Sequence, residues 1–161
     1  MKKYLDRARV SKNDEFYTRL EDIENELKHY DLSGKVVYCN CDDPYKSNFV
    51  KYFIDNFNEL GIDRLYATHY TPDEGLFCEN DKKPNFMLEY DGSYKYSVLL
   101  GDGDFRSDEC VDILKRCDVV VTNPPFSLFR EFVDLIMSHE KDFLVIGNQN
   151  AITYKKFFQV I

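Results

Sequence analysis

The sequence predicts one α/β domain, with a mostly parallel sheet covered by helices on both faces. Short apolar segments typical of buried strands alternate with amphipathic segments typical of helices along most of the 161 residues. The clearest strand is the run of β-branched residues at 119–121. The chain has the length of a single domain, and neither internal repeats nor a low-complexity linker divide it.

The first predicted elements are an arm, a helix and a strand. Residues 1–13 are basic and polar, which is typical of a loose lead-in, and we expect the domain to occupy residues 14–161. Thr18 and Glu21 fit a capping box, in which two side chains bond free amides of the first helical turn. The helix that follows carries apolar residues at helical spacing: Leu20, Ile23, Leu27 and Tyr30. Ser33-Gly34 ends this helix, and residues 35–39 then form a predicted buried strand.

The next part predicts a long helix between two strands, followed by a hairpin. Ser47 is a suitable cap because its hydroxyl can accept a hydrogen bond from the first helical turn. Gly61 ends this helix, and its apolar face is formed by Phe49, Phe53, Phe57 and Leu60. Residues 64–69 form the second predicted strand, and residues 71–85 are polar and irregular. Asp91-Gly92 has the turn chemistry of a β-hairpin, with strands at 86–89 and 94–100.

The last part returns to the alternation of helices and strands. Helices are predicted at 107–116 and 127–137, and strands at 118–122 and 143–146. A further helix begins near Tyr154, and the chain stops inside it. We therefore expect a longer parent protein.

Composition limits the functional class. The chain is 43% hydrophobic and 16% aromatic, which excludes a disordered protein. A formal net charge of −8 counts against tight nucleic-acid binding by these residues alone, since phosphate binding needs a basic face. No apolar run has the length of a membrane span and no signal peptide opens the chain, so we expect a cytoplasmic protein without a membrane partner. Five cysteines without a Cys-x-x-Cys pair and three scattered histidines predict no metal site.

Three unusual loops follow predicted strands, and their position is the main functional indication. Ligands of open parallel sheets bind beyond the carboxyl ends of the strands. The loops are residues 40–44 (Asn-Cys-Asp-Asp-Pro), 101–105 (Gly-Asp-Gly-Asp-Phe) and 123–126 (Asn-Pro-Pro-Phe). We expect them to meet at one edge of the sheet.

The first loop suits a ligand with positive charge. It lacks the Gly-x-Gly-x-x-Gly pattern of dinucleotide binders, and the carboxylates of Asp42 and Asp43 would repel a pyrophosphate. S-adenosylmethionine carries a sulfonium and an ammonium group, and its own carboxylate can lie near the helix start at Ser47. The alternative is that both aspartates are solvated turn residues.

The second and third loops can hold two adenine rings. Asp104 can accept a hydrogen bond from the amino group of one adenine while Phe105 packs against its face, although a simple tight turn also explains this loop. In the third loop, Pro124 and Pro125 have no amide hydrogen and form a rigid turn. That turn directs the Asn123 side-chain oxygen and the Pro124 carbonyl toward one amino group, and Phe126 can stack on its base. The alternative for this loop is a structural stop after the strand.

These residues resemble a known family. Asn-Pro-Pro-Phe at 123–126 matches the (Asp/Asn/Ser)-Pro-Pro-aromatic motif of amino-methyltransferases. "NDEFYT" at 13–18 resembles the cofactor segment of adenine-specific DNA methyltransferases. "CDDPYKSNF" at 41–49 and "GNQNAITYKKFF" at 147–158 are similar to the EcoRI-type modification enzymes. The resemblance covers nearly the whole chain from about Lys12.

The resemblance implies a Rossmann-like S-adenosylmethionine-dependent methyltransferase fold, here truncated at its C-terminus. It implies site-specific methylation of adenine N6 in a restriction-modification system, by direct transfer to a flipped base and without a metal. It assigns the target base to Asn123, Pro124, Pro125 and Phe126. It assigns the cofactor to Tyr17, Thr18, Asn40, Asp42, Asp43, Pro44, Ser47, Asp104 and Phe105.

Two departures from the family pattern keep alternatives open. No acid ends the second strand to hold the cofactor ribose, and Asp73 and Glu74 lie further on. The C-terminal region through which the family reads double-stranded DNA is absent from this chain. The alternatives are methylation of another amino nitrogen, in RNA, cytosine or protein glutamine, and a catalytically silent cofactor-binding module or fragment.

Overall fold

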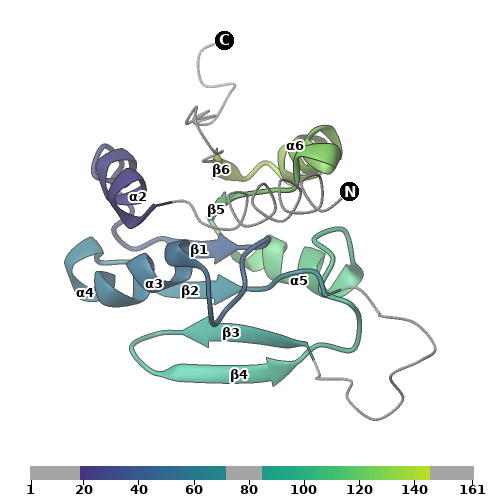
Figure 1. Ribbon diagram of the computed structural model, residues 1–161, viewed down its shortest axis with the longest axis horizontal. Coiled ribbons are helices and arrows are strands. Elements are labelled where there is room, and N and C mark those ends of the chain that lie inside the picture. The colour runs from purple at the N-terminus through teal and green to yellow at the C-terminus, as the bar shows by residue number, and fades with distance from the viewer. Residues whose placement is uncertain (1–18, 72–84, 146–161) are drawn as a thin grey trace, which may run out of the picture.

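A computed structural model describes residues 19–71 and 85–145, which form a six-stranded sheet with helices on both faces (Figure 1). The strand order is β4-β3-β2-β1-β5-β6. Four strands run parallel, and they are β1 (Val36–Cys39), β2 (Arg64–Ala67), β5 (Val119–Thr122) and β6 (Asp142–Val145). β3 (Phe86–Tyr90) and β4 (Tyr94–Val98) form an antiparallel hairpin at one edge. The predicted α/β architecture is confirmed, and the edge hairpin makes the sheet mixed.

Alternating side chains of the strands build two separate cores. Val37 and Val121 face one core, together with α2 (Leu20–Leu27) and α3 (Asn48–Asp55). Their neighbours Tyr38 and Val120 face the other core, together with α5 (Asp108–Arg116) and α6 (Phe129–Ser138). Successive side chains of a strand point to opposite faces, so the four parallel strands are buried on both sides. This explains the apolar character of the strands in the sequence.

The start of α2 differs from the predicted capping box. Arg19 is the N-cap residue, with φ −64° and ψ 139°, and its side chain makes no capping hydrogen bond. The first helical bond runs from the amide of Ile23 to the carbonyl of Arg19 at 3.1 Å. Because the cap lies one residue later than predicted, Glu21 is not in the position that a capping box requires. Thr18 itself lies outside the described residues.

The predicted long helix after Ser47 is two helices. α3 ends at Asp55, its C-cap residue Asn56 has φ −110° and ψ 16°, and α4 (Phe57–Leu60) follows. The Asn56 side chain donates to the Tyr52 carbonyl at 2.9 Å, and such side-chain bonding competes with helix continuation. The Ser47 cap is confirmed, because its hydroxyl accepts from the Phe49 amide at 3.1 Å. Gly61 ends α4 in the left-handed conformation, as predicted.

The remaining described elements follow the prediction closely. Ser107 caps α5, and the 3₁₀ turn η1 (Phe126–Leu128) precedes α6, which begins two residues later than predicted. The exposed strand β4 ends at Val98 rather than at residue 100. The predicted arm, most of the irregular stretch at 71–85 and the predicted C-terminal helix lie outside the described residues. Within the described part of the chain, no helix is long and apolar enough to cross a membrane.

Candidate functional site

Three parallel strands bring two of the predicted loops to one edge of the sheet. β1 lies between β2 and β5, with Cys39 opposite Ala67 and Tyr38 opposite Val120. The chain leaves β1 toward β2 on one side and later returns to β5 on the other. The carboxyl end of β1 is therefore a topological switch point, where open α/β sheets bind their ligands. The loop after β1 (residues 40–47) and the turn after β5 (residues 123–126) follow these strand ends.

The side chain of Asp42 is buried at this edge of the sheet and is hydrogen-bonded to groups from two segments. One carboxylate oxygen accepts the Ser47 hydroxyl at 2.9 Å, and the other accepts the Thr122 hydroxyl at 2.5 Å. The backbone amide of Asn123 also bonds this carboxylate. Burial raises the pKa of the Asp42 carboxyl to about 6, and these three hydrogen bonds act in the opposite direction. The carboxylate therefore joins the loop after β1 to the turn after β5.

Thr122 is a site residue that sequence reasoning missed. As the last residue of β5 it was expected only to complete a buried strand. Its hydroxyl donates to Asp42 and also accepts from the backbone amide of Cys41 at 3.1 Å. The available signal was a hydroxyl residue directly before Asn-Pro-Pro-Phe, but its partners lie 80 and 81 residues earlier in the sequence. Local patterns do not report such a pairing.

Asp43, in the same loop, is more accessible than Asp42, and His69 lies near it from the segment after β2. Asp43 Oδ1 accepts the Tyr45 amide at 2.8 Å, which is the turn contact expected of an aspartate in a loop. Its other oxygen lies 3.9 Å from His69 Nε2. Burial lowers the pKa of His69, Asp43 raises it, and Lys46 lowers it further. The side chain of Asp43 is 25% exposed, so a ligand can reach this carboxylate.

Asn40 carries an unsatisfied acceptor at the end of β1. The residue is 2% exposed, and its Oδ1 atom has no hydrogen-bond partner among the described residues. A buried polar atom without a partner is destabilising, and native structures contain few of them. Asn40 thus offers a ligand a hydrogen-bond acceptor at the switch point. Pro44 is also buried, and it follows the two aspartates in the same loop.

The second predicted loop packs against the segment after β2. The Thr71 amide donates to the Asp102 carbonyl at 2.8 Å. Gly103 has φ +78°, and a Cβ atom built on it would lie 2.0 Å from the carbonyl oxygen of His69. Glycine is therefore required here for both its backbone conformation and the close approach of two backbones. This contact holds residues 101–105 beside the end of β2.

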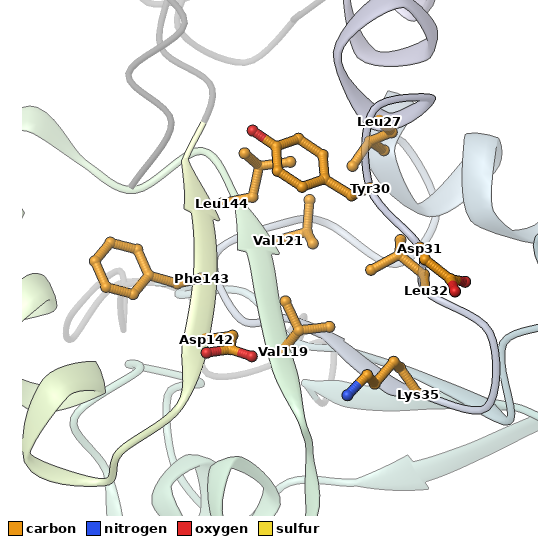
Figure 2. Close-up of a pocket in the computed structure, with 10 residues that line it drawn as sticks. All are labelled: Leu27, Tyr30, Asp31, Leu32, Lys35, Val119, Val121, Asp142, Phe143 and Leu144. Carbon is orange, nitrogen blue, oxygen red and sulfur yellow. The ribbon is translucent and has the colours of Figure 1, made fainter. Parts of the chain in front are cut away.

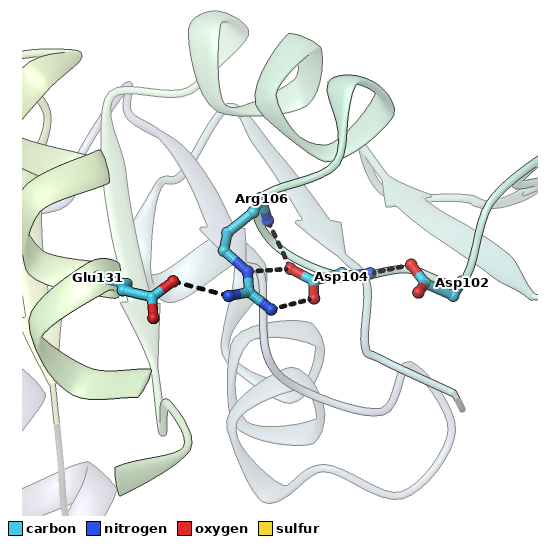
Figure 3. A network of polar contacts seen from close by, with 4 residues as sticks. All are labelled: Asp102, Asp104, Arg106 and Glu131. Atoms are coloured by element: carbon cyan, nitrogen blue, oxygen red, sulfur yellow. Dashed lines mark hydrogen bonds and ion pairs between the residues drawn. The ribbon is translucent and has the colours of Figure 1, made fainter. Parts of the chain in front are cut away.

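Asp104 and Phe105 already have partners within the protein. Asp104 forms a bidentate ion pair with the Arg106 guanidinium, which also donates a hydrogen bond to Glu131 at 2.7 Å (Figure 3). The hydrogen bond from the Arg106 side chain is the main cause that lowers the pKa of Asp104. Phe105 is 5% exposed, and its ring meets Phe132 edge-on with centroids 5.5 Å apart. Adenine binding by these two residues stays a prediction.

The turn after β5 presents one aromatic ring to solvent. Pro124 is buried and Asn123 is partly buried, whereas Pro125 and Phe126 are exposed. The Phe126 side chain has a 57% exposed surface and opens the 3₁₀ turn η1. Exposure of a large ring directly beside a buried turn leaves a face available for stacking. Tyr17 and Thr18, the remaining predicted cofactor residues, lie outside the described residues.

A cavity in the described part of the chain lies away from these loops. It measures about 330 Å³ and lies between α2 and the strands β5 and β6 (Figure 2). Its lining includes Val119 and Asp142, the first residues of their strands, and it is largely apolar. It therefore belongs to the opposite end of the sheet from Asp42 and Asn123. Cavity size alone does not identify the candidate site.

Comparison with known proteins decides the family. The family model described as "Adenine-specific methyltransferase EcoRI" matches residues 4–161. The chain belongs to this family. It is 50% identical to Type II methyltransferase M.EcoRI of Escherichia coli, over 99% of this chain and 52% of that protein. It is 42% identical to Type II methyltransferase M.MpnI of Mycoplasma pneumoniae, over 98% of this chain and 47% of that protein. No solved structure matches the chain.

Membership in the EcoRI-type family confirms the resemblance noted in the sequence. It places this chain among methyltransferases, whose reaction uses a methyl donor. The chain spans about half the length of the curated relatives it matches. Among the described residues, no three histidine, cysteine or acidic side chains gather as metal ligands.

Proposed function

We propose that this chain forms the cofactor-binding and catalytic part of a DNA adenine-N6 methyltransferase of a restriction-modification system. The observation that carries the proposal is the position of Asn-Pro-Pro-Phe at the switch point, in a chain that belongs to the EcoRI-type family. The motif lies beside the loop after β1, where a methyl donor would bind. Donor and acceptor of the methyl group would then meet at one edge of the sheet.

S-adenosylmethionine is the proposed methyl donor. The Asn40 oxygen, which has no partner within residues 19–71 and 85–145, can accept a hydrogen bond from its ammonium or hydroxyl groups, and the accessible Asp43 carboxylate complements its positive charge. Asp42 and Ser47 were also expected to bind the cofactor, but their side chains are bonded to each other, so the role proposed for them here is to support this loop. Tyr17, Thr18, Pro44, Asp104 and Phe105 complete the proposed cofactor set. When bound, the cofactor supplies an electrophilic methyl group.

The proposed role of the turn is to orient the target adenine. The Asn123 side-chain oxygen and the Pro124 carbonyl would accept the two hydrogens of the amino group, and the exposed ring of Phe126 would stack on the flipped base. Pro125 keeps the turn rigid. Most of the rate enhancement would come from orientation, which is worth several orders of magnitude for well-placed reactants.

Double-stranded DNA is the proposed partner, bound chiefly by residues outside this chain. The chain has a net charge of −8 and covers about half of its relatives. Those two facts also favour a second candidate, in which the chain by itself binds the cofactor but transfers no methyl group. The two candidates differ in activity and agree in cofactor binding.

Calorimetric titration with S-adenosylmethionine and, separately, with NAD tests the proposal. We expect saturable binding of S-adenosylmethionine alone. A folded chain that binds neither ligand would contradict the proposed cofactor site. Transfer of a labelled methyl group from S-adenosylmethionine to duplex DNA then separates the two candidates.

We predict that Asn123→Ala leaves S-adenosylmethionine affinity within about threefold and lowers methyl transfer by about 100-fold or more, since Asn123 would act on the base. Asn25→Ala, on the exposed face of α2, is the matched control and should change neither quantity. An equal loss of cofactor affinity and transfer in folded Asn123→Ala would show that the assignment is wrong.

A further inference from the structure

We propose that the side chains of Thr122 and Asp42 form a clamp that positions the target-base turn against the cofactor loop. Thr122 is a positioning residue in this proposal, and neither side chain of the clamp contacts the methyl donor or the base. The inference rests on the proposed function for its catalytic meaning. The clamp itself is a feature of the fold that can be tested without activity.

The hydrogen bonds of Thr122 define the clamp. The Cys41 amide can only donate, so the Thr122 hydroxyl accepts from it at 3.1 Å. The single hydroxyl hydrogen is then available for the Asp42 carboxylate, at 2.5 Å. Thr122 is fully buried and directly precedes Asn123. Its hydroxyl therefore fixes the strand end from which the turn starts.

Asp42 receives donors from three directions. The Thr122 hydroxyl and the Asn123 amide come from the end of β5, and the Ser47 hydroxyl comes from the cap of α3. With both oxygens bonded and 7% of the residue exposed, the carboxylate has little surface left for a ligand. Asp43, next in the sequence, keeps an accessible carboxylate. The two adjacent aspartates thus have different tasks.

The position of the turn after β5 relative to the loop after β1 matters for the proposed reaction. Asn123 follows the clamp directly, and the loop from Cys41 to Ser47 carries the cofactor residues. A displacement of about 1 Å between reacting groups can lower a rate about 100-fold. Loss of the Thr122 hydroxyl should therefore affect transfer more strongly than cofactor affinity.

Thr122→Val tests the clamp, because valine keeps the shape of threonine and removes the hydroxyl. Amide hydrogen exchange, followed by NMR in the whole chain, measures how well the backbone amides of Cys41 and Asn123 are protected. We expect the Cys41 amide, which loses its acceptor, to exchange about tenfold faster or more. The Asn123 amide should also exchange faster, because its acceptor Asp42 is no longer tied to the end of β5 by the Thr122 hydroxyl. Thr122→Ser keeps the hydroxyl and should retain exchange within about twofold of the wild type.

Thr68→Val is the matched control for the loss of a buried hydroxyl. Thr68 is also fully buried and directly follows β2, but its hydroxyl bonds Tyr38 at 2.7 Å and has no bond to Asp42. We expect Thr68→Val to leave the amides of Cys41 and Asn123 protected. If Thr122→Val does not fold, Asp42→Asn replaces it, because an amide has one acceptor oxygen and cannot accept the Thr122 and Ser47 hydroxyls on two separate oxygens as the carboxylate does.

Cofactor affinity and transfer give the functional readout. We expect Thr122→Val and Asp42→Asn to bind S-adenosylmethionine within about threefold of the wild type, with kcat for DNA methylation lowered about tenfold or more and rescued by Thr122→Ser. Two changes in one clamp should also be non-additive, so the double variant should lose little more than the worse single variant.

Two results would overturn the clamp. Unchanged exchange at Cys41 and Asn123 in folded Thr122→Val would show that the hydroxyl does not hold the two loops. A loss of S-adenosylmethionine affinity above about tenfold in Asp42→Asn would show that this carboxylate binds the cofactor directly. Failure of the wild type to bind S-adenosylmethionine would instead contradict the proposed function, and the exchange result would still decide the clamp.

Discussion

The carboxyl group of Asp42 is buried although it is bonded to hydroxyls and an amide rather than to a cation. Burial raises its pKa from the ordinary value of 3.8 to about 6, so the folded protein binds a proton here more tightly than the unfolded chain does. Ionisation of Asp42 therefore lowers the free energy of unfolding as pH rises from about 4 to about 6. Ionised Asp42 therefore lowers the free energy of unfolding at neutral pH, although its hydrogen bonds join the two loops.

At the residue scale, we predict that Asp42→Asn becomes relatively more stable than the wild type as pH rises. Asparagine does not ionise, so the variant lacks the cost of about 3 kcal/mol that the pKa shift implies above pH 6. The difference in the free energy of unfolding between variant and wild type, measured with urea at about pH 4 and pH 7, should shift in favour of the variant by up to this amount. A constant difference would mean that Asp42 titrates normally.

At the element scale, three loops are held by contacts between distant segments. The clamp joins the ends of β1 and β5, and the Gly103 contact holds residues 101–105 against the end of β2. These loops take their shape from the strand ends, and the strands themselves are only four residues long. Substitutions that distort these loops should therefore lower the free energy of unfolding.

We predict that Gly103→Ala destabilises the protein by about 2 kcal/mol or more, because the new Cβ would add a clash with the His69 carbonyl to the cost of a positive φ. Gly92→Ala is the control, since Gly92 also has a positive φ, of +105°, but its Cβ would meet open space. Urea unfolding of both variants isolates the clash. Equal destabilisation would show that the two backbones separate without cost.

Sequence patterns predicted the elements better than the contacts between them. The alternation of apolar strands and amphipathic helices is local, and so are the caps at Ser47 and Gly61, so these features were correctly predicted. The break at Asn56 depends on one side-chain hydrogen bond that competes with the helix. The partners of Thr122 and the packing of Phe105 on Phe132 depend on tertiary structure, so no short pattern announces them.

At the scale of the whole molecule, the net charge of the chain is negative and therefore has the same sign as that of DNA, the proposed substrate. The chain carries 29 acidic and 21 basic residues, which gives it a net charge of −8. DNA-binding affinity depends strongly on the neutralisation of phosphates by basic side chains. The proposed division is therefore that this chain contributes the reaction site, and other residues contribute most of the DNA affinity.

We predict that this chain alone binds duplex DNA no more tightly than non-specific complexes, with a Kd of about 1 μM or weaker at physiological salt. Fluorescence anisotropy with labelled duplexes of different sequence measures this affinity. Tight and sequence-selective binding would show that recognition residues lie within this chain.

The span of the clamp also has a consequence for folding. Thr122 and Asp42 are 80 residues apart in the sequence, so the site does not exist until β1 and β5 have paired. Pairings of such long range tend to form slowly, because the entropy of closing the loop is lost before the contacts are gained. A ligand that binds at this edge would thus select chains whose sheet is complete, and it would shift the folding equilibrium toward them by mass action.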